Sequence, residues 1–342
     1  MTRIFIALCI VLLGSNGLSC HGQISGLFDK VFLARDSLPM SLDGVPGLRA
    51  ATDETRALLE GIWWKPEAFE ITCERPLEWR YDCLVKFPSA WKTGDRVNDS
   101  VVAEWHMARN EAGEIITAPA LIVVHESGRS MAVGRTFAML FSRAGLHTFM
   151  VQMPGYGVRS NPEEPGDGAN FVQRARQAVS DVRRARDAAA VLPFVDSTHI
   201  GLQGTSLGGF ISATAAGIDG KFDSVFIMLA GGDIYKVIAH GQKDAAKIRK
   251  RLAGAGLEGT ELEQQLARIE PNLVANRLNP QKTWLFSAKH DTVVPLENAL
   301  TWARAVGLDS KHHIILQADH YSGITYIPTM VFKVRDLIRA AE

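Results

Sequence analysis

The chain has 342 residues, of which 46% are hydrophobic and 22% are charged, the composition of a globular protein that can bury a large core. Its 37 basic and 37 acidic residues cancel, so no net field favours a nucleic-acid partner or an acidic polymer as substrate. Length alone does not require two domains, because α/β folds often exceed about 250 residues as one unit. We expect one main domain with additions.

The first 22 residues differ from the rest of the chain. Arg3 precedes an apolar run over residues 4–13, and small or polar residues dominate from there to Gly22. The run is about half of the roughly 20 residues that a membrane-spanning helix needs, so the pattern predicts a signal peptide over residues 1–22. We therefore expect an exported protein, periplasmic or secreted. It would be attached to a membrane only if Cys20 were lipidated, and Gly17 departs from the larger apolar residue usual in that signal.

Cleavage after Cys20 would leave Cys73 and Cys83 as the only cysteines of the mature chain. An even pair in an exported protein predicts a disulfide, which would close a short loop and stabilise by about 2 to 3 kcal/mol. The alternative is two buried free thiols. No further cysteine or close histidine pair lies near enough to predict a zinc site.

Residues 23–78 precede the strands that the sequence makes recognisable, and we expect them to form a helical arm. One helix is predicted over residues 53–62, and Trp63-Trp64-Lys65-Pro66 ends it. The adjacent tryptophans are interpreted as apolar packing against the main domain, with the lining of a substrate cleft as the alternative.

Over residues 79–342 short apolar runs alternate with helical patterns. Strands are predicted over 83–87, 101–107, 120–124, 147–152, 199–203, 224–229, 282–286 and 313–316, and helices over 131–144, 171–192 and 327–341. The alternation predicts an α/β fold with a mostly parallel, doubly wound sheet covered by helices on both faces. Residues 234–280 are helical and charged, and we expect a lid-type insertion there. The arginines of the second helix are interpreted as a solvated face: Arg174, Arg176, Arg183, Arg184 and Arg186.

The segment around Ser206 carries a motif with a clear physical meaning. A buried strand runs into Gly204-Thr205-Ser206-Leu207-Gly208, and an alanine-rich helix follows. This is the pattern of a nucleophile elbow, where a serine lies on a strained turn and glycines two residues away let the backbones pass. Ser206 is the predicted nucleophile, and the amide N–H of Leu207 is a predicted oxyanion donor. The alternative is a chance match in a glycine-rich turn.

A serine hydroxyl needs a histidine to take its proton and a carboxylate to orient that histidine. Asp291 follows the strand predicted over 282–286, and His320 follows the strand over 313–316. Because the carboxyl ends of parallel strands gather on one edge of a sheet, we expect both residues to meet Ser206. Asp233 is the alternative carboxylate, but the local pattern around Asp291 is stronger.

With serine, acid and histidine in this order, residues 83–340 resemble an α/β-hydrolase. The resemblance is carried by residues 187–196, 204–209, 290–295 and by His320. Within that superfamily the chain is most similar to the dienelactone hydrolase-like and acetyl xylan esterase-like carboxylesterases. The resemblance implies an acyl-enzyme mechanism with no metal or organic cofactor, and a small-molecule or carbohydrate ester as substrate.

The segment His125-Glu126-Ser127-Gly128 departs from the family, most of whose members have His-Gly here. A His-Glu pair is similar to dienelactone hydrolases, whose glutamate contacts the nucleophile, but those enzymes use cysteine where this chain has Ser206. The family geometry implies that the amide of Ser127 is the second oxyanion donor. Two roles stay open for Glu126: tuning Ser206, or binding nearby backbone amides as a structural carboxylate.

The sequence therefore predicts an exported serine carboxylesterase that cleaves small-acyl esters. The alternatives are a serine peptidase of the same fold and a catalytically silent hydrolase fold that serves as a binding protein. The silent alternative is weakened because the chain keeps a serine, an acid and a histidine.

Overall fold

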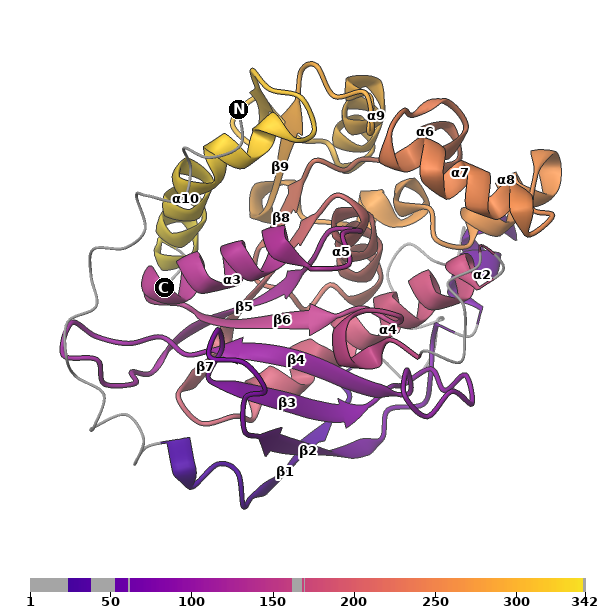
Figure 1. The fold of residues 1–342 in the computed structure, drawn as a ribbon. Coiled ribbons are helices and arrows are strands. Elements are labelled where there is room, and N and C mark those ends of the chain that lie inside the picture. The colour runs from indigo at the N-terminus through magenta and orange to yellow at the C-terminus, as the bar shows by residue number, and fades with distance from the viewer. Residues whose placement is uncertain (1–23, 38–52, 61, 162–167, 169, 341–342) are drawn as a thin grey trace.

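The computed structural model describes residues 24–37, 53–60, 62–161, 168 and 170–340 (Figure 1). The predicted signal peptide over residues 1–22, with Cys20, lies outside the described residues. Within the described part no helix is both long and apolar enough to cross a membrane. The same residues contain no group of three or more histidine, cysteine, aspartate and glutamate side chains placed to hold a metal ion.

A single mixed sheet forms the centre of the molecule. Its strands are β1 (Val31–Arg35), β2 (Ala68–Glu74), β3 (Cys83–Pro88), β4 (Ser100–His106), β5 (Ala118–Val124), β6 (His147–Gln152), β7 (Val195–Thr205), β8 (Val225–Met228), β9 (Thr283–Ala288) and β10 (His313–Leu316). The sheet has 10 strands in the order β1-β2-β3-β4-β6-β5-β7-β8-β9-β10. Pairing is antiparallel from β1 to β6 and parallel from β6 to β10. The predicted α/β sheet is confirmed, and its parallel part carries the candidate site.

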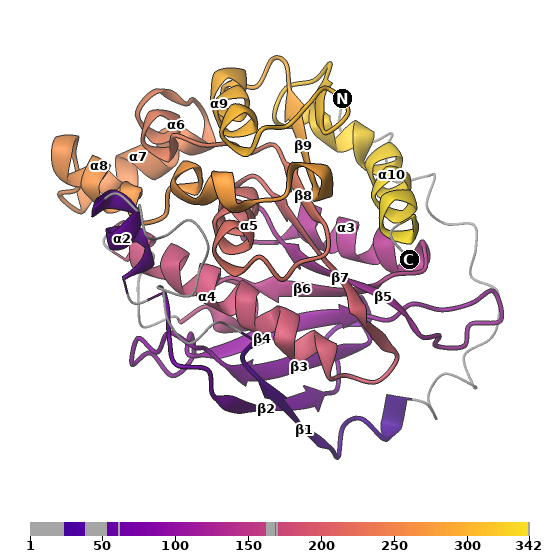
Figure 2. The same cartoon turned by 180° about the vertical axis from the view of Figure 1, so that it is seen from behind.

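Helices cover both faces of the sheet. They are α2 (Asp53–Leu59), α3 (Ala132–Arg143), α4 (Phe171–Ala190), α5 (Leu207–Asp219), α6 (Ile234–His240), α7 (Asp244–Gly254), α8 (Gly259–Ala267), α9 (Leu296–Val306) and α10 (Ile327–Arg339). Figures 1 and 2 show α3 and α10 on one face and α4, α5 and α9 on the other. The buried apolar side chains divide accordingly, because Phe137 of α3 and Val334 of α10 share one core cluster, while Val179 of α4 and Ile211 of α5 share another.

Short 3-10 turns and the predicted insertion complete the fold. The turns are η3 (Gly157–Arg159), η4 (Pro271–Arg277), η5 (Pro280–Lys282) and η6 (Ser322–Tyr326). The insertion over residues 234–280 is helical, as predicted, and its helices α6, α7 and α8 lie together on one side of the molecule, in orange in Figure 1.

The segment over residues 23–78 differs from the helical arm that the sequence indicated. Helix α2 is present, but β1 and β2 also belong to the segment, and they extend the central sheet at its edge. Burial alternates along β1, with Val31 and Leu33 on the exposed face, but apolar residues occupy both faces, so the sequence lacks a matching alternation of polar and apolar side chains. A strand without that alternation gives little signal in the sequence.

The prediction of a solvated arginine face on α4 was wrong for three side chains. Arg176, Arg183 and Arg184 are buried, while Arg174 and Arg186 are partly buried. The guanidinium of Arg184 binds the carboxylate of Asp36 at 2.6 Å, and neither side chain reaches solvent. The reason lies in the N-terminal segment, which covers this helix and supplies partners for cations that would otherwise face water.

The two adjacent tryptophans show how that cover is made. Arg183 lies over the rings of Trp63 and Trp64 at 5.0 and 4.8 Å from the ring centres. The indole N–H of Trp64 also donates to Asp36 at 2.7 Å. These stacked contacts between cations and aromatic rings agree with the interpretation of the tryptophans as packing residues.

The predicted disulfide is absent: Cys73 and Cys83 are both buried and both free. They lie on neighbouring antiparallel strands, but Cys73 is opposite Val85, which makes the two cysteines diagonal neighbours. Diagonal positions lie roughly 7 to 8 Å apart, with their Cβ atoms somewhat closer, whereas a disulfide needs Cβ atoms about 3.5 to 4.5 Å apart. A hydrogen bond with Cys73, and then burial, raise the pKa of the Cys83 thiol well above its usual range. The alternative of two buried thiols describes this structure.

Candidate active site

Ser206 lies on the sharp turn between β7 and α5, as the motif predicted. Its backbone has φ 53° and ψ −119°, a conformation that L-residues rarely adopt. A Cβ atom on Gly204 would lie 2.3 Å from the carbonyl oxygen of Gly208, and one on Gly208 would lie 2.3 Å from that of His125. Gly204 therefore lets β7 and α5 pass each other, and Gly208 lets α5 approach the end of β5, which accounts for the spacing of the motif.

The structure brings Ser206, His320 and Asp291 together. The hydroxyl oxygen of Ser206 lies 3.0 Å from Nε2 of His320, and Nδ1 of His320 lies 2.7 Å from Oδ2 of Asp291. The Asp291 side chain is 1% exposed, and its Oδ1 accepts hydrogen bonds from the amides of Val293 and Val294. A carboxylate held in this way orients the ring, so that Nε2 faces the hydroxyl as a proton acceptor.

Asp233, the alternative carboxylate, does not take part in this arrangement. It begins α6, where its side chain accepts from the amide of Lys236 and forms an ion pair with the Lys236 ammonium at 2.6 Å. Its partners show that it caps a helix of the insertion.

Leu207 and Ser127, whose backbone amides are the predicted oxyanion donors, both line cavities at the site. Neither N–H donates to another protein group among the residues that the structure describes. Leu207 is the first residue of α5, so its N–H points out of the helix end, where the dipole favours negative charge. The phenol of Tyr156 donates to the carbonyl oxygen of Ser127 at 3.2 Å and so holds the loop. The two amides are therefore available to an anion beside Ser206.

Glu126 binds backbone amides, one of the two roles that the sequence left open. Its carboxylate accepts from the amides of Val133 at 3.1 Å and Gly134 at 3.0 Å, in the first turn of α3. A carboxylate at this position satisfies helix-end donors and interacts favourably with the dipole. The structure gives Glu126 no hydrogen bond to Ser206 within the described residues.

Two buried histidines are neutral rings: His125 beside the site, and His147 at the amino end of β6, away from the site. Nδ1 of His125 donates to the carbonyl oxygen of Glu126 at 2.6 Å, and Nε2 accepts from the amide of Met153 at 3.1 Å. Nδ1 of His147 accepts from the indole of Trp105 and from the amide of Ala108, each at 3.2 Å. Burial lowers the pKa of both rings to about 4. Protonation would remove acceptors that buried N–H groups use.

These rings predict that the protein loses stability in mild acid. An unfolded histidine takes up its proton near pH 6.5, whereas the folded rings stay neutral until about pH 4, so the unfolded state binds more protons in between. Their contribution is complete above pH 6.5 and falls as the pH drops toward 4, by up to roughly 3 kcal/mol per ring. Urea unfolding across this range measures the change.

The matched variants are His147→Gln and, as control, replacement of the exposed His290 by Gln. The first should reduce the pH dependence of the free energy of unfolding, because only His125 of the two rings remains, and the second should leave it unchanged. A wild-type stability that is constant between pH 7 and 4.5 would contradict the assignment of neutral rings.

A cavity of about 370 Å³ opens beside Ser206, and we call it the apolar cavity. Its apolar lining consists of Val133, Phe137, Met228, Leu229, Ile324, Ile327 and Met330. Asp244, the first residue of α7, also lines it and accepts a hydrogen bond from the phenol of Tyr321 at 2.9 Å. The insertion thus contacts the loop that carries His320. The contact is not predictable from the sequence, because no local motif relates α7 to Tyr321. The lid role of the insertion stays a prediction.

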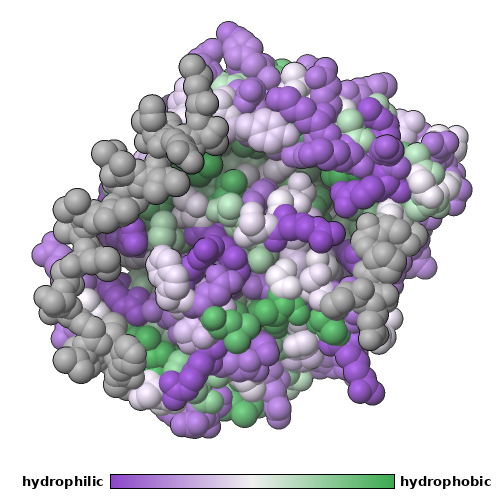
Figure 3. Space-filling model, in the orientation of Figure 1, coloured by the Kyte–Doolittle hydropathy of each residue, from purple (hydrophilic) through white to green (hydrophobic). Residues whose placement is uncertain are grey.

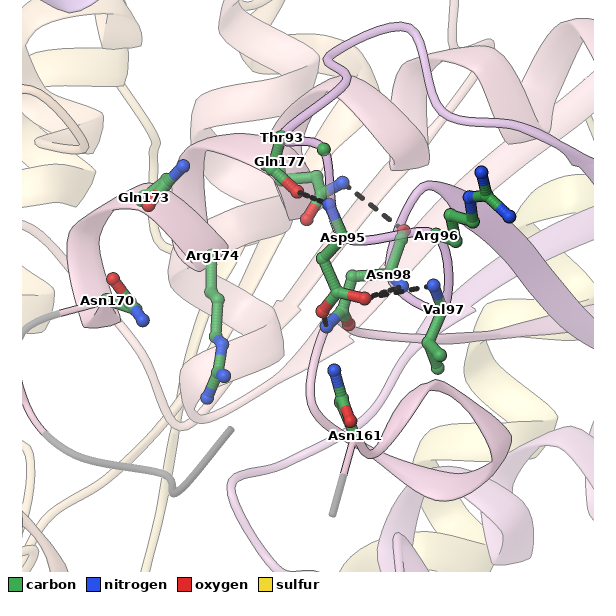
Figure 4. Close-up of a pocket in the computed structure, with 11 residues that line it drawn as sticks. Thr93, Asp95, Arg96, Val97, Asn98, Asn161, Asn170, Gln173, Arg174 and Gln177 are labelled. Carbon is green, nitrogen blue, oxygen red and sulfur yellow. Dashed lines mark hydrogen bonds between the residues drawn. The ribbon is translucent and has the colours of Figure 1, made fainter. Parts of the chain in front are cut away.

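A larger cavity of about 880 Å³, the polar cavity, lies between the loop over residues 93–98 and the start of α4. Amide side chains line much of it: Asn98, Asn161, Asn170, Gln173 and Gln177. Figure 4 shows Arg174 extending from α4 between Asn170 and Asn161.

Comparison with known proteins agrees with this fold. Residues 170–325 match the model of the prolyl oligopeptidase family. A search of curated proteins found no match to this chain. Among solved structures, acetyl xylan esterase from Paenibacillus sp. R4 is 16% identical with a TM-score of 0.60, over 83% of this chain and 92% of that one.

Two further solved structures are similar. The α/β hydrolase GrgF from Penicillium sp. sh18 is 15% identical with a TM-score of 0.54, over 75% of this chain and 98% of that one. Pyrococcus horikoshii acylaminoacyl peptidase is 16% identical with a TM-score of 0.53 over 80% of this chain, which spans only 41% of that protein. At such identities the likeness shows the fold. The chain thus has the α/β-hydrolase fold that its motifs predicted, and its family match supports a serine hydrolase.

Proposed function

We propose that the protein is an exported serine carboxylesterase that cleaves small-acyl esters through an acyl-enzyme intermediate. The observation that carries the proposal is the chain of contacts from Ser206 through His320 to Asp291 at the mouth of the apolar cavity. Export is proposed from the signal-peptide pattern of residues 1–22.

In the proposed reaction the Ser206 hydroxyl attacks the ester carbonyl carbon while His320 takes the hydroxyl proton. The amides of Leu207 and Ser127 stabilise the negative charge on the former carbonyl oxygen. His320 then gives the proton to the leaving alcohol, and the acyl group stays on Ser206. Water activated by His320 releases the acid and restores the serine. Asp291 keeps the imidazolium oriented and stabilises its charge in both halves of the cycle.

Two features support an ester with a small apolar group. The apolar cavity has room for a short chain and is closed by side chains from α3, α10 and the η6 turn. The similarity to an acetyl xylan esterase supports a carbohydrate ester as one substrate class, with the acyl group as the part that the cavity would take.

A serine peptidase is the second candidate, because the family match is to the prolyl oligopeptidase family and one similar structure is an acylaminoacyl peptidase. The same groups would serve, since an amide differs from an ester only in the poorer leaving group that His320 must protonate.

Hydrolysis of p-nitrophenyl esters from acetyl to dodecanoyl, against aminoacyl p-nitroanilides, tests the proposal. We expect kcat/KM to be highest for short acyl chains and to fall once the chain exceeds the apolar cavity, with the anilides slower than the best ester. Faster cleavage of the anilides would replace the esterase by the peptidase. Absence of activity on both, together with no labelling by a fluorophosphonate, would favour the silent binding protein.

A further inference from the structure

A second cavity adjoins the site at the loop that carries Ser127. It measures about 140 Å³ and shares Ser127 and Leu207, the two oxyanion candidates, with the site. Its charged lining is entirely basic among the described residues: Arg129, Arg174 and Arg251. We call it the basic cavity.

The three arginines come from separate parts of the chain. Arg129 lies in the loop after β5, Arg174 in the first turn of α4, and Arg251 on α7 of the insertion. The guanidinium of Arg174 lies against Gly155, where an added Cβ atom would be 3.4 Å from Nη1. Figure 3 shows hydrophilic side chains gathered over the face on which Figure 1 places α6 and α7. Three segments that are distant in the sequence thus supply the arginines that line the basic cavity.

Arg129 and Arg251 have no acidic partner. Neither forms an ion pair or a hydrogen bond within the part of the chain that the structure describes. Both are exposed, whereas some more buried arginines are paired, as in the contacts of Arg135 with Glu104 and of Arg184 with Asp36, each at 2.6 Å. Because like charges in one cavity repel each other, this arrangement is one that a bound anion would stabilise.

The three arginines act electrostatically on the phenol of Tyr156. Its phenol lies at the wall of the basic cavity and bonds the carbonyl oxygen of Ser127. Burial raises the pKa of Tyr156, while Arg251, Arg129 and Arg174 each oppose that rise electrostatically. All three cations therefore lie within electrostatic reach of one spot beside the oxyanion loop.

We propose that the basic cavity binds a carboxylate of the substrate, while the apolar cavity beside Ser206 holds an apolar group. The inference rests on the proposed function and names its substrate class: an ester that bears a carboxylate on one side of the scissile bond. Guanidinium groups suit this task because their planar donors match the two oxygens of a carboxylate. Because Arg251 lies on α7, the insertion contributes to the preference for esters that bear a carboxylate.

The test compares acidic esters with neutral isosteres. The pairs are para-acetoxybenzoate with para-acetoxybenzamide, for a carboxylate on the alcohol side, and mono-para-nitrophenyl glutarate with para-nitrophenyl pentanoate, for the acyl side. We expect kcat/KM to be about tenfold higher for the acidic member of at least one pair, the low end for a charge-assisted hydrogen bond. The preference should shrink as NaCl approaches about 1 M, where exposed charges are screened within roughly 3 Å.

Arg129→Gln combined with Arg251→Gln should bring the ratio of acidic to neutral ester close to one. Lys250→Gln is the matched control, because Lys250 is an exposed cation next to Arg251 that lines none of the described cavities, and its ratio should equal that of the wild type. Equal rates on both members of each pair, or a preference that survives the double variant, would overturn the inference.

Binding to the Ser206→Ala protein separates this inference from the proposed function. Calorimetry with para-hydroxybenzoate and glutarate, against para-hydroxybenzamide, measures anion recognition without hydrolysis. Binding of an acid that the arginine double variant loses would uphold the basic cavity even if no ester were cleaved. Lack of binding, with esters still hydrolysed, would refute the carboxylate site and leave the esterase standing.

Discussion

Replacement of Ser206 by alanine is expected to lower kcat/KM for p-nitrophenyl acetate by about 10³ to 10⁶-fold. Its hydroxyl is the only nucleophile that the geometry places against His320 Nε2, at 3.0 Å, among the described residues. The residual rate would come from substrate binding and from the amides of Leu207 and Ser127, which do not depend on the side chain. A loss of this size is about 4 to 8 kcal/mol of transition-state stabilisation.

The fold should survive this change. The Ser206 side chain makes its hydrogen bond to His320 alone, and alanine places the same Cβ atom on the strained turn. The melting temperature should therefore stay within a few degrees of the wild type. Ser130→Ala is the matched control, since Ser130 is an exposed serine on the neighbouring loop. Comparable activity in the two variants would remove Ser206 from the mechanism.

The parts of the site that the sequence predicted are those with a local cause. Gly204 is constrained by Gly208 within the turn itself, and the spacing of the two glycines around Ser206 alone indicated the elbow. Asp291 and His320 follow β9 and β10, and parallel pairing of these strands brings loops distant in sequence to one edge. Chain order was therefore enough to predict which residues meet.

The parts that the sequence did not predict depend on contacts between distant segments. Arg184 has the pattern of a solvated residue, and only the fold brings Asp36 against it from 148 positions away. Similarly, Asp244 meets Tyr321 because the insertion returns over the site. Polar residues on a helix surface carry no periodic signal that distinguishes a solvated cation from a buried, paired one.

The role of Glu126 likewise combines a part that the sequence predicts with a part that depends on a contact between distant segments. The sequence placed it in the turn after β5 but left two roles open, and the choice required the position of α3, whose amides bind it at 3.0 and 3.1 Å. The disulfide prediction failed for the same reason. An even number of cysteines predicts a disulfide, but it does not give the register of β2 against β3, which decides whether the two cysteines can pair.

Asp291→Asn is expected to lower kcat by about 10³ to 10⁴-fold while preserving the fold. The amide oxygen of asparagine can still accept from Val293 and Val294, which keeps the loop in place. Its amide nitrogen, however, would face Nδ1 of His320 and donate to it, where Asp291 now accepts at 2.7 Å. The ring would then carry its proton on Nε2, the atom that has to receive the proton of Ser206.

Asp233→Asn is the matched control for this substitution, and it also decides between the two carboxylates. Asp233 binds Lys236 at the start of α6, so its replacement should change kcat by less than about twofold, the size expected away from the reacting groups. Measurement of kcat for both variants on one short p-nitrophenyl ester, with circular dichroism to verify folding, gives the comparison. A larger loss in Asp233→Asn than in Asp291→Asn would transfer the acid role to Asp233. It would also mean that α6 moves toward His320 in the working enzyme.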